Sequence, residues 1–186
     1  MADLGAPGRI IDNPISGERI VIHTSAAQTG GALLAFDLFL PPGGHVPARH
    51  VHPMQEEKFT IVDGELCFQL GRRTVLATRG QTVLIPRGKA HWFGNKGAQV
   101  AHARVEVRPA LRMEELLATT ETLARSSRLC GTRLPSLPHL AAVLLEFHRE
   151  LAVPVVPAAV VRIVLRPLAW FARRRPLTRR PASLEP

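Results

Sequence analysis

Two histidines and a glutamate stand close together in the stretch ARHVHPMQEEKFTIVDG. His50 and His52 are two residues apart, so on a β-strand both imidazoles would point to the same side and could chelate a metal ion. Glu57 is an odd number of residues after His52 and would face the other way on an unbroken strand. Pro53 rules out a simple continuation. A turn or bulge across residues 53–56 could bring Glu57 back to the histidines.

Taken alone, an HxH pair is weak evidence for a metal site, because paired histidines on a strand are often ordinary surface or core residues. Glu56 is a rival of Glu57 as a ligand, since either carboxylate could turn inward. A third histidine, His91, follows a Pro-x-Gly turn in the run GQTVLIPRGKAHWFGN. From the residues alone, these side chains are either metal ligands or ordinary polar groups at the mouth of a hairpin.

The spacing of these residues resembles the two motifs of the cupin superfamily. The first motif corresponds to Gly44, five residues, His50-x-His52, four residues, Glu57, six residues and Gly64. The second corresponds to Gly80, five residues, Pro86-x-Gly88, two residues, His91, three residues and Asn95. All ten specified positions match, and 15 residues separate the motifs.

The chain therefore resembles a small, single-domain, quercetinase-like cupin. This resemblance implies a double-stranded β-helix, or jelly-roll barrel. It also implies one divalent metal ion per chain, with four ligands: His50, His52, Glu57 and His91. Three imidazoles and one carboxylate suit Fe, Mn, Ni, Cu, Co or Zn and do not choose among them. The set lacks the thiolates typical of closed structural zinc sites, and it leaves positions free for a substrate or O₂.

By the same resemblance we expect a non-haem, dioxygenase-like oxidoreductase that acts on a small hydrophobic or aromatic compound. The expected pocket lining is apolar: Phe59, Ile61 and Phe93. The sequence identifies no general base beyond the ligands, and the catalytic candidates depend on which side chains line the pocket: Glu57, Glu56 and His102. Two alternatives stay open. One is a metal-dependent isomerase or cyclase, and the other is a non-catalytic module that binds a metal or a small ligand.

Short apolar segments separated by turn residues predict a mainly β domain. The segments are 19–23, 32–40, 57–62, 65–70, 74–79, 81–86 and 98–107. Asp63-Gly64 is the strongest hairpin signal among the turns. Helical spacing of apolar residues then predicts helices over 111–129 and 136–152. We expect a jelly-roll barrel followed by a C-terminal α-helical extension, with these boundaries: 1–110 for the barrel, 111–172 for the helices and 173–186 for a basic, disordered tail.

Length and composition fit one globular domain with an appendage. The 186 residues are 46% hydrophobic and include only two cysteines, Cys67 and Cys130. This number excludes a disulfide-rich scaffold and suits a reducing compartment. The first residues lack the basic and apolar regions of a signal peptide, so we expect a cytoplasmic protein. The expected partners are a small molecule and a second copy in a homodimer, and no nucleic acid.

Positive charge is concentrated near the C-terminus. Residues 161–186 contain seven arginines and one acid, which gives +6 of the formal net charge of +9. The apolar run before them, residues 151–161, is broken by two prolines and is shorter than the roughly 20 residues of a membrane span. We prefer a helix over about 158–166 that packs on protein. The alternative is peripheral contact of residues 154–180 with an anionic membrane.

Overall fold

The computed structural model describes residues 8–129, 136–154, 163–167 and 169–170 of the chain. Nine β-strands come first within this described part, and two α-helices and the helical residues 163–167 follow them. The helices are α1 (Met113–Leu129) and α2 (Leu137–Glu146). The chain is thus mainly β with a C-terminal helical region, as the sequence predicted.

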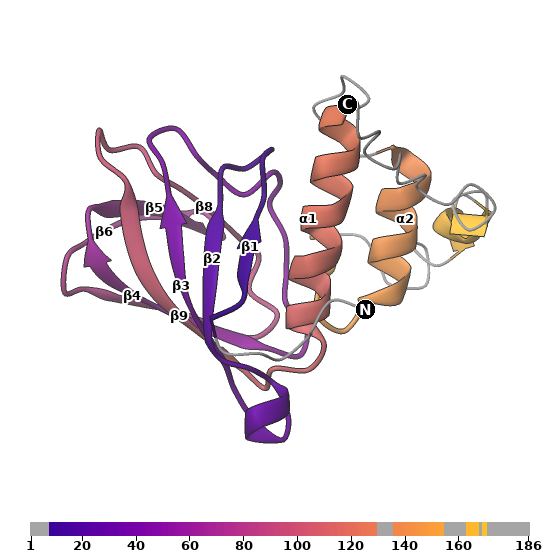
Figure 1. The fold of residues 1–186 in the computed structure, drawn as a ribbon, viewed down its shortest axis with the longest axis horizontal. Helices are drawn as coiled ribbons and strands as arrows, with labels where there is room; N and C mark the ends of the chain where they lie inside the picture. Colours follow the sequence, from indigo (N-terminus) through magenta and orange to yellow (C-terminus); the bar gives the residue numbers. More distant parts are fainter. Residues whose placement is uncertain (1–7, 130–135, 155–162, 168, 171–186) are drawn as a thin grey trace, which may run out of the picture.

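The strands form two antiparallel sheets that enclose the core (Figure 1). The larger sheet has the order β1 (Ile10–Asp12), β2 (Arg19–Thr24), β3 (Leu34–Leu40), β9 (Ala101–Arg108), β4 (Glu56–Asp63) and β7 (Thr82–Ile85). The smaller sheet has the order β6 (Arg73–Thr78), β5 (Glu65–Leu70) and β8 (His91–Gly94). Isolated bridges then add the segment before β4 to the free edge of β8, which places the first histidines in the smaller sheet.

Alternation of side chains explains how the larger sheet buries one face. Along β9 the residues at every second position are buried: Ala101, Ala103, Val105 and Val107. On β4 the buried positions are Phe59 and Ile61, and Glu57 occupies the next position on the same face. The apolar face of the sheet therefore carries a carboxylate into the interior, where a charge needs polar partners.

The two helices stand side by side next to the β1 edge of the larger sheet (Figure 1). Their apolar side chains belong to the same buried cluster as the barrel core: Met113, Leu116, Leu123, Val143 and Phe147. Fully burying an aliphatic or aromatic side chain stabilises a fold by about 1.5–3 kcal/mol. This shared core is therefore the main attachment of the helices to the barrel.

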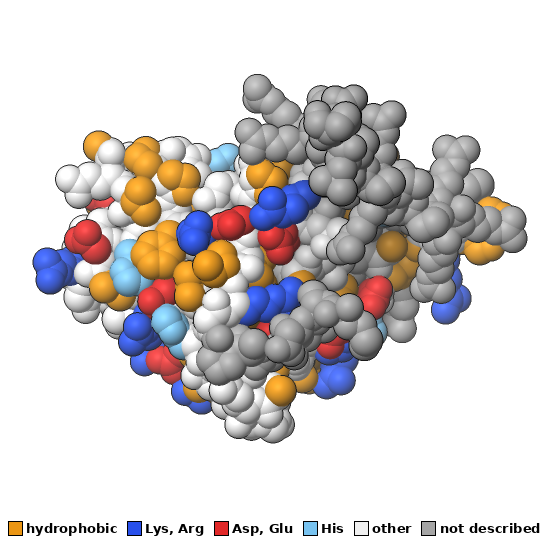
Figure 2. Space-filling model, in the orientation of Figure 1, with side chains coloured by type: hydrophobic (Ala, Val, Ile, Leu, Met, Phe, Trp, Pro, Cys, Tyr) orange, Lys and Arg blue, Asp and Glu red, His pale blue; other side chains and the backbone are white. Residues whose placement is uncertain are grey.

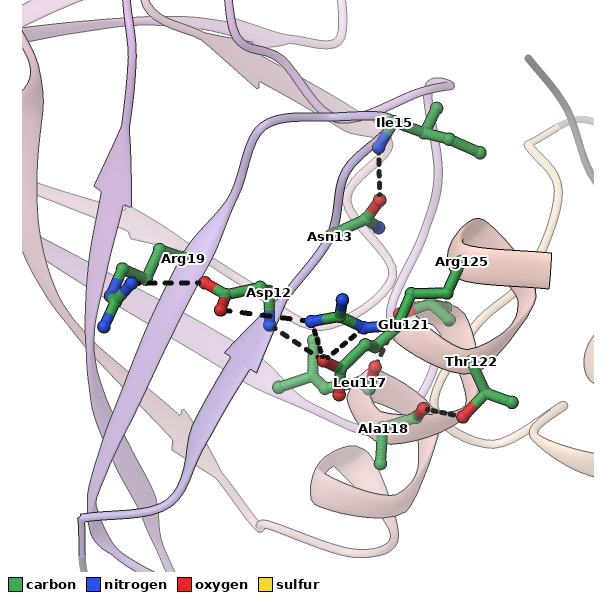
Figure 3. A network of polar contacts seen from close by, with 10 residues as sticks. Asp12, Asn13, Ile15, Arg19, Leu117, Ala118, Glu121, Thr122 and Arg125 are labelled. Atoms are coloured by element: carbon green, nitrogen blue, oxygen red, sulfur yellow. Dashed lines mark hydrogen bonds and ion pairs between the residues drawn. The ribbon is translucent and has the colours of Figure 1, made fainter. Parts of the chain in front are cut away.

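Polar contacts add direction to this attachment (Figure 3). The main-chain N–H of Asp12 donates to Glu121 Oε1 on α1 at 3.3 Å, and the guanidinium of Arg125 donates to the same carboxylate. The Asp12 carboxylate lies 3.8 Å from Arg19 and 4.0 Å from Arg125. Figure 2 shows Lys or Arg side chains next to Asp or Glu side chains near the middle of this face. Both arginines are more than half exposed, so these ion pairs orient α1 and contribute little stability.

The second predicted helix is shorter than the sequence suggested. It ends at Glu146, because Phe147 leaves the helical region with φ −101° and ψ 32°. The chain then turns, and Ala152 forms an isolated antiparallel bridge with Val51. The prediction of a helix to residue 152 was wrong at this end, since tertiary pairing takes over residues whose apolar spacing also fits a helix.

The Asp63-Gly64 turn is present, but it is not a hairpin. Gly64 has φ +71°, a conformation that glycine adopts without strain. The strands on its two sides, β4 and β5, belong to different sheets, so the turn carries the chain from one sheet to the other. A Cβ at Gly64 would also lie 3.0 Å from Ala101 Cα, so the close approach of β9 excludes a side chain there.

Much of the C-terminal end lies outside the described residues: 155–162, 168 and 171–186. The basic tail expected at 173–186 belongs to this part, as does most of the segment considered for membrane contact, 154–180. Cys130 also lies outside the described residues, in the gap at 130–135. Residues 163–167 are helical, which covers the second half of the helix expected over 158–166. Among the described residues, no helix combines the length and the apolar character needed to cross a membrane.

Candidate metal centre

The segment before β4 and strand β8 place two histidines directly opposite each other. His50 N–H donates to His91 O and His91 N–H donates to His50 O, both at 2.9 Å. Residues paired in this way point their side chains to the same face, and the two ring centroids are 4.3 Å apart. The ring of His52 lies 4.9 Å from that of His50 and 5.2 Å from that of His91. The three imidazoles therefore form one cluster.

A turn between His52 and β4 brings Glu57 to the same place. The chain bends at Pro53 and Met54 and enters β4 at Glu56, as the parity argument required. Gln55 holds this turn. Its side chain is fully buried, and its Nε2 donates to the carbonyls of Pro109 and Ala110 at 3.0 and 2.8 Å. Glu57 consequently faces the interior, beside the histidines.

All three imidazoles turn the same nitrogen toward the main chain. Nδ1 of His50 lies 3.0 Å from the carbonyl oxygen of Ala48, and Nδ1 of His91 lies 3.0 Å from that of Lys89. Nδ1 of His52 contacts the carbonyl oxygen of Glu150. A carbonyl oxygen can only accept, so each Nδ1 must carry the proton. In a neutral imidazole the lone pair then lies on Nε2.

The remaining ring nitrogens lie near one another, and two of them lie near a carboxylate oxygen. One ligand atom from each histidine lies within 4.8 Å of the others. Oε2 of Glu57 is 3.1 Å from Nε2 of His91 and 3.4 Å from Nε2 of His52. This Oε2 and the Nε2 of His91 are buried, and neither has a well-directed hydrogen bond among the described residues. Ligand atoms on one metal, each at about 2.1 Å from it, lie roughly 3–4 Å apart. The His50-His52-His91 cluster could therefore hold a metal ion.

Burial and mutual repulsion decide the charge state of the cluster. Desolvation, together with His52 and His91, lowers the pKa of His50 to about 4, so this imidazole is neutral at neutral pH. Burial alone would raise the pKa of Glu57, but His52 and His91 hold it well below the usual range. Burial alone would lower the pKa of His52. The effect of the Glu57 carboxylate is larger than that of burial, so the pKa of His52 is raised. A divalent cation could replace the proton that Glu57 favours on His52.

Comparison with known proteins identifies the fold around this cluster. The family profile described as "Cupin domain" matches residues 37–107, a range that includes all three histidines. This part of the chain is therefore similar to cupin domains. A comparison with curated proteins gives no match.

Several solved structures are similar to parts of this chain. A Thermotoga maritima protein described as a predicted oxalate decarboxylase is 24% identical, and the match covers 54% of this chain and 90% of that one, with a TM-score of 0.48. KdgF from a Halomonas species is 15% identical over 50% of this chain and 81% of its own, with a TM-score of 0.45. A Thermus thermophilus protein is 25% identical over 42% and 74%, with a TM-score of 0.40. Likenesses at these levels assign no activity to the chain.

The two-sheet fold does not bring every candidate residue to the cluster. Glu56 and His102 lie at outward positions of β4 and β9, opposite to the buried faces of these strands. His102 stacks on Phe39 at 4.4 Å and its Nε2 lies 3.3 Å from the carboxylate of Asp37. The structure therefore corrects the suggestion that Glu56 or His102 lines the pocket, because strand alternation turns both away from Glu57.

The residues expected to line the pocket are buried inside the barrel. Phe59 and Ile61 follow Glu57 on the inner face of β4, and Phe93 follows His91 on β8. The rings of Phe59 and Phe93 have centroids 5.1 Å apart. The interior beside the cluster is thus apolar on both sheets.

Two polar groups of the interior were missed by sequence reasoning. The carbonyl of Glu150 contacts a residue 98 positions earlier, and no local pattern could reveal this pairing. The inward position of Glu18 could have been predicted. Glu18, Ile20 and Ile22 are spaced two residues apart, and both isoleucines are buried. Ser16 Oγ donates to Glu18 Oε2 at 2.6 Å. Burial, with a smaller contribution from the charge of Glu57, raises the pKa of Glu18.

Proposed function

We propose that this protein is a mononuclear metal-binding cupin and acts as a dioxygenase-like oxidoreductase on a small hydrophobic or aromatic compound. The observation that carries the proposal is the cluster of three imidazoles, two of which place Nε2 within 3.4 Å of the buried Oε2 of Glu57, an atom left without a well-directed hydrogen bond. A buried charge of this kind is costly unless it is paired or coordinates a metal. The proposed ligands are His50, His52, Glu57 and His91.

The residues of the site have separate tasks in this proposal. When bound, a divalent transition metal supplies Lewis acidity and, if it is redox-active, electrons for chemistry with O₂. Main-chain carbonyls accept a hydrogen bond from Nδ1–H of each histidine, which leaves the lone pair of Nε2 free to bind a metal. Phe59, Ile61 and Phe93 exclude water and favour an apolar substrate. Glu57 contributes negative charge that offsets that of a cation.

The first test is the metal content of the protein purified without added metal. We expect about one transition-metal ion per chain, as the resemblance to cupins implies, and its loss in a His50→Ala/His91→Ala double variant. The matched control is His23→Ala/His102→Ala, which also removes two histidines but acts on the outer face of the sheet. Metal-dependent O₂ uptake with a panel of aromatic enols and carboxylates would then support the dioxygenase activity.

The outcomes separate the alternatives. A protein that binds no metal, even after addition of Fe, Mn, Ni, Cu, Co and Zn, would refute the proposed function. Retention of the metal in the His50→Ala/His91→Ala variant would also refute the assigned ligands. A bound metal without O₂ uptake would remove the dioxygenase activity and leave an isomerase, a cyclase or a non-catalytic binding module.

A further inference from the structure

One imidazole of the cluster is oriented by the helical extension and not by the barrel. His50 and His91 each contact a carbonyl two residues earlier in their own segment. His52 instead contacts the carbonyl of Glu150, beyond the end of α2. We infer that residues 147–152, which we term the strap, position His52 for metal binding. This inference rests on the proposed function, since it concerns the same metal centre.

The strap is paired with the backbone next to His52. Val51 N–H donates to Ala152 O at 3.0 Å, and Ala152 N–H donates to Val51 O at 2.9 Å. The residue adjacent to a candidate ligand is thus held by two main-chain hydrogen bonds. The carbonyl of Glu150 lies two residues earlier on the strap and receives the Nδ1–H of His52. The backbone and the side chain of this region are fixed by the same short segment.

The strap is itself anchored firmly in the molecule. Phe147, at its start, is 2% exposed and belongs to the shared core. The N–H groups of Glu150 and Leu151 both donate to the Phe147 carbonyl, at 3.0 and 2.7 Å. The Glu150 carboxylate is buried and accepts the main-chain N–H of Arg112 at 3.2 Å, just before α1. The Arg112 guanidinium lies 4.8 Å from the centre of the Phe147 ring. The strap therefore holds its place relative to both helices.

Loss of the strap contact would affect metal binding through the tautomer of His52. Without an acceptor at Nδ1, the proton can move to Nε2, and the ring can rotate away from Glu57. Groups that fix the tautomer and orientation of a ligand histidine typically change metal affinity by about 10–100-fold when they are removed. The strap lies outside residues 37–107, the part matched by the cupin profile. The metal affinity of this cupin domain accordingly depends on a segment that the domain itself does not contain.

The test uses the full-length protein with Ala152→Pro. Proline lacks the N–H that bonds Val51 and so breaks the bridge. The matched control is Val153→Pro, one residue further. Val153 is 41% exposed, and its N–H makes no backbone hydrogen bond among the described residues. Proline at 153 also favours the extended backbone that Ala152 already has in the bridge. Co²⁺ titration measures affinity, and long-range ¹H–¹⁵N correlation spectra of the metal-free protein measure the tautomer of His52.

We expect the Ala152→Pro variant to bind Co²⁺ about 10–100-fold more weakly than the wild type and to lose the Nδ1–H tautomer of His52. In the Val153→Pro control, the Co²⁺ affinity and the tautomer of His52 should both be unchanged. A second pair guards against misfolding. Glu150→Ala should show the same two effects through loss of the Arg112 contact, and Glu150→Gln, which keeps an acceptor oxygen, should restore them.

The results distinguish this inference from the proposed function. An unchanged tautomer and unchanged Co²⁺ affinity in both Ala152→Pro and Glu150→Ala would overturn the role of the strap. Suppose that the wild-type protein binds no Co²⁺, and that the Ala152→Pro variant nevertheless loses the Nδ1–H tautomer of His52. The strap would then still orient His52. In that case only the metal-binding function would fail.

Discussion

At the scale of single residues, Glu57 is the decisive group of the site. Its carboxylate occupies a position that Phe59 and Ile61 share on the inner face of β4. The two imidazoles near its Oε2 are the groups that hold its pKa low, and they belong to His52 and His91. Such a carboxylate favours a cation among the imidazoles. Glu56, its neighbour and rival in the sequence, faces outward and cannot serve in this way.

Replacement by glutamine should therefore affect metal binding at Glu57 and leave it unaffected at Glu56. Glu57→Gln keeps the shape of the side chain and removes its charge, so we expect Co²⁺ affinity to fall at least about tenfold. Glu56→Gln is the matched control and should leave the affinity unchanged. Chelator competition measures both. Weaker binding by Glu56→Gln with normal binding by Glu57→Gln would mean that the ligand assignment is reversed.

At the scale of secondary structure elements, short apolar segments separated by turn residues made most of the barrel predictable. Strands β3, β5 and β9 agree with the expected segments to within three residues. Strands β1 and β8 were not anticipated. Each has only three or four residues, too few for a pattern to emerge. His91 was nevertheless identified, because its position relative to the Pro-x-Gly turn is a matter of spacing and needs no knowledge of the strand.

Contacts between distant segments could not be predicted. The end of α2 depends on the pairing of Ala152 with Val51, and the destination of the Asp63-Gly64 turn depends on which sheet β5 joins. Neither is encoded in a local pattern of apolar residues. The four expected ligands were proposed because their spacing resembles the cupin motifs, whereas the Glu150 carbonyl near His52 was missed for the same reason as the end of α2.

The outer face of the larger sheet shows how elements are joined away from the metal centre. Asp37 on β3 contacts an imidazole on β2 and both an imidazole and a guanidinium on β9. Its carboxylate lies 2.8 Å from His23 on β2 and 3.3 and 3.2 Å from His102 and Arg104 on β9. Figure 2 shows histidine and acidic side chains beside hydrophobic ones above these strands. Partial burial would raise the pKa of Asp37, but His23 and Arg104 outweigh it and lower that pKa.

A lowered pKa gives Asp37 a defined pH dependence. The ionised carboxylate stabilises the folded state above the ordinary aspartate pKa of 3.8, and this stabilisation is lost as the pH falls through the lower value of the folded state. We expect Asp37→Asn to lower the free energy of unfolding by roughly 1 kcal/mol at neutral pH. Urea unfolding of both proteins over a pH series measures the difference. It should shrink below about pH 4, and a difference that grew toward acid would contradict the assignment.

At the scale of the whole molecule, the barrel and the helices share a single hydrophobic core. The core cluster runs without interruption from strand residues such as Val107 to Val143 and Phe147 at α2. The boundary expected near residue 110 separates strands from helices along the chain, but it does not separate two cores. The strap adds a functional link, because it reaches from the helical region to His52.

Two truncations should therefore behave differently. A chain ending at residue 154 keeps α2 and the strap, and we expect it to bind Co²⁺ like the full-length protein. A chain ending at residue 135 lacks Val143, Phe147 and the Glu150 carbonyl. The burial of an aliphatic or aromatic side chain such as these stabilises the fold by up to about 1.5–3 kcal/mol. Because this stabilisation is lost, the shortened chain should unfold at a lower temperature. It should also bind Co²⁺ at least about tenfold more weakly. Calorimetry should show one transition for the full-length protein. A chain ending at residue 135 with full-length stability and affinity would mean that the barrel alone builds the site.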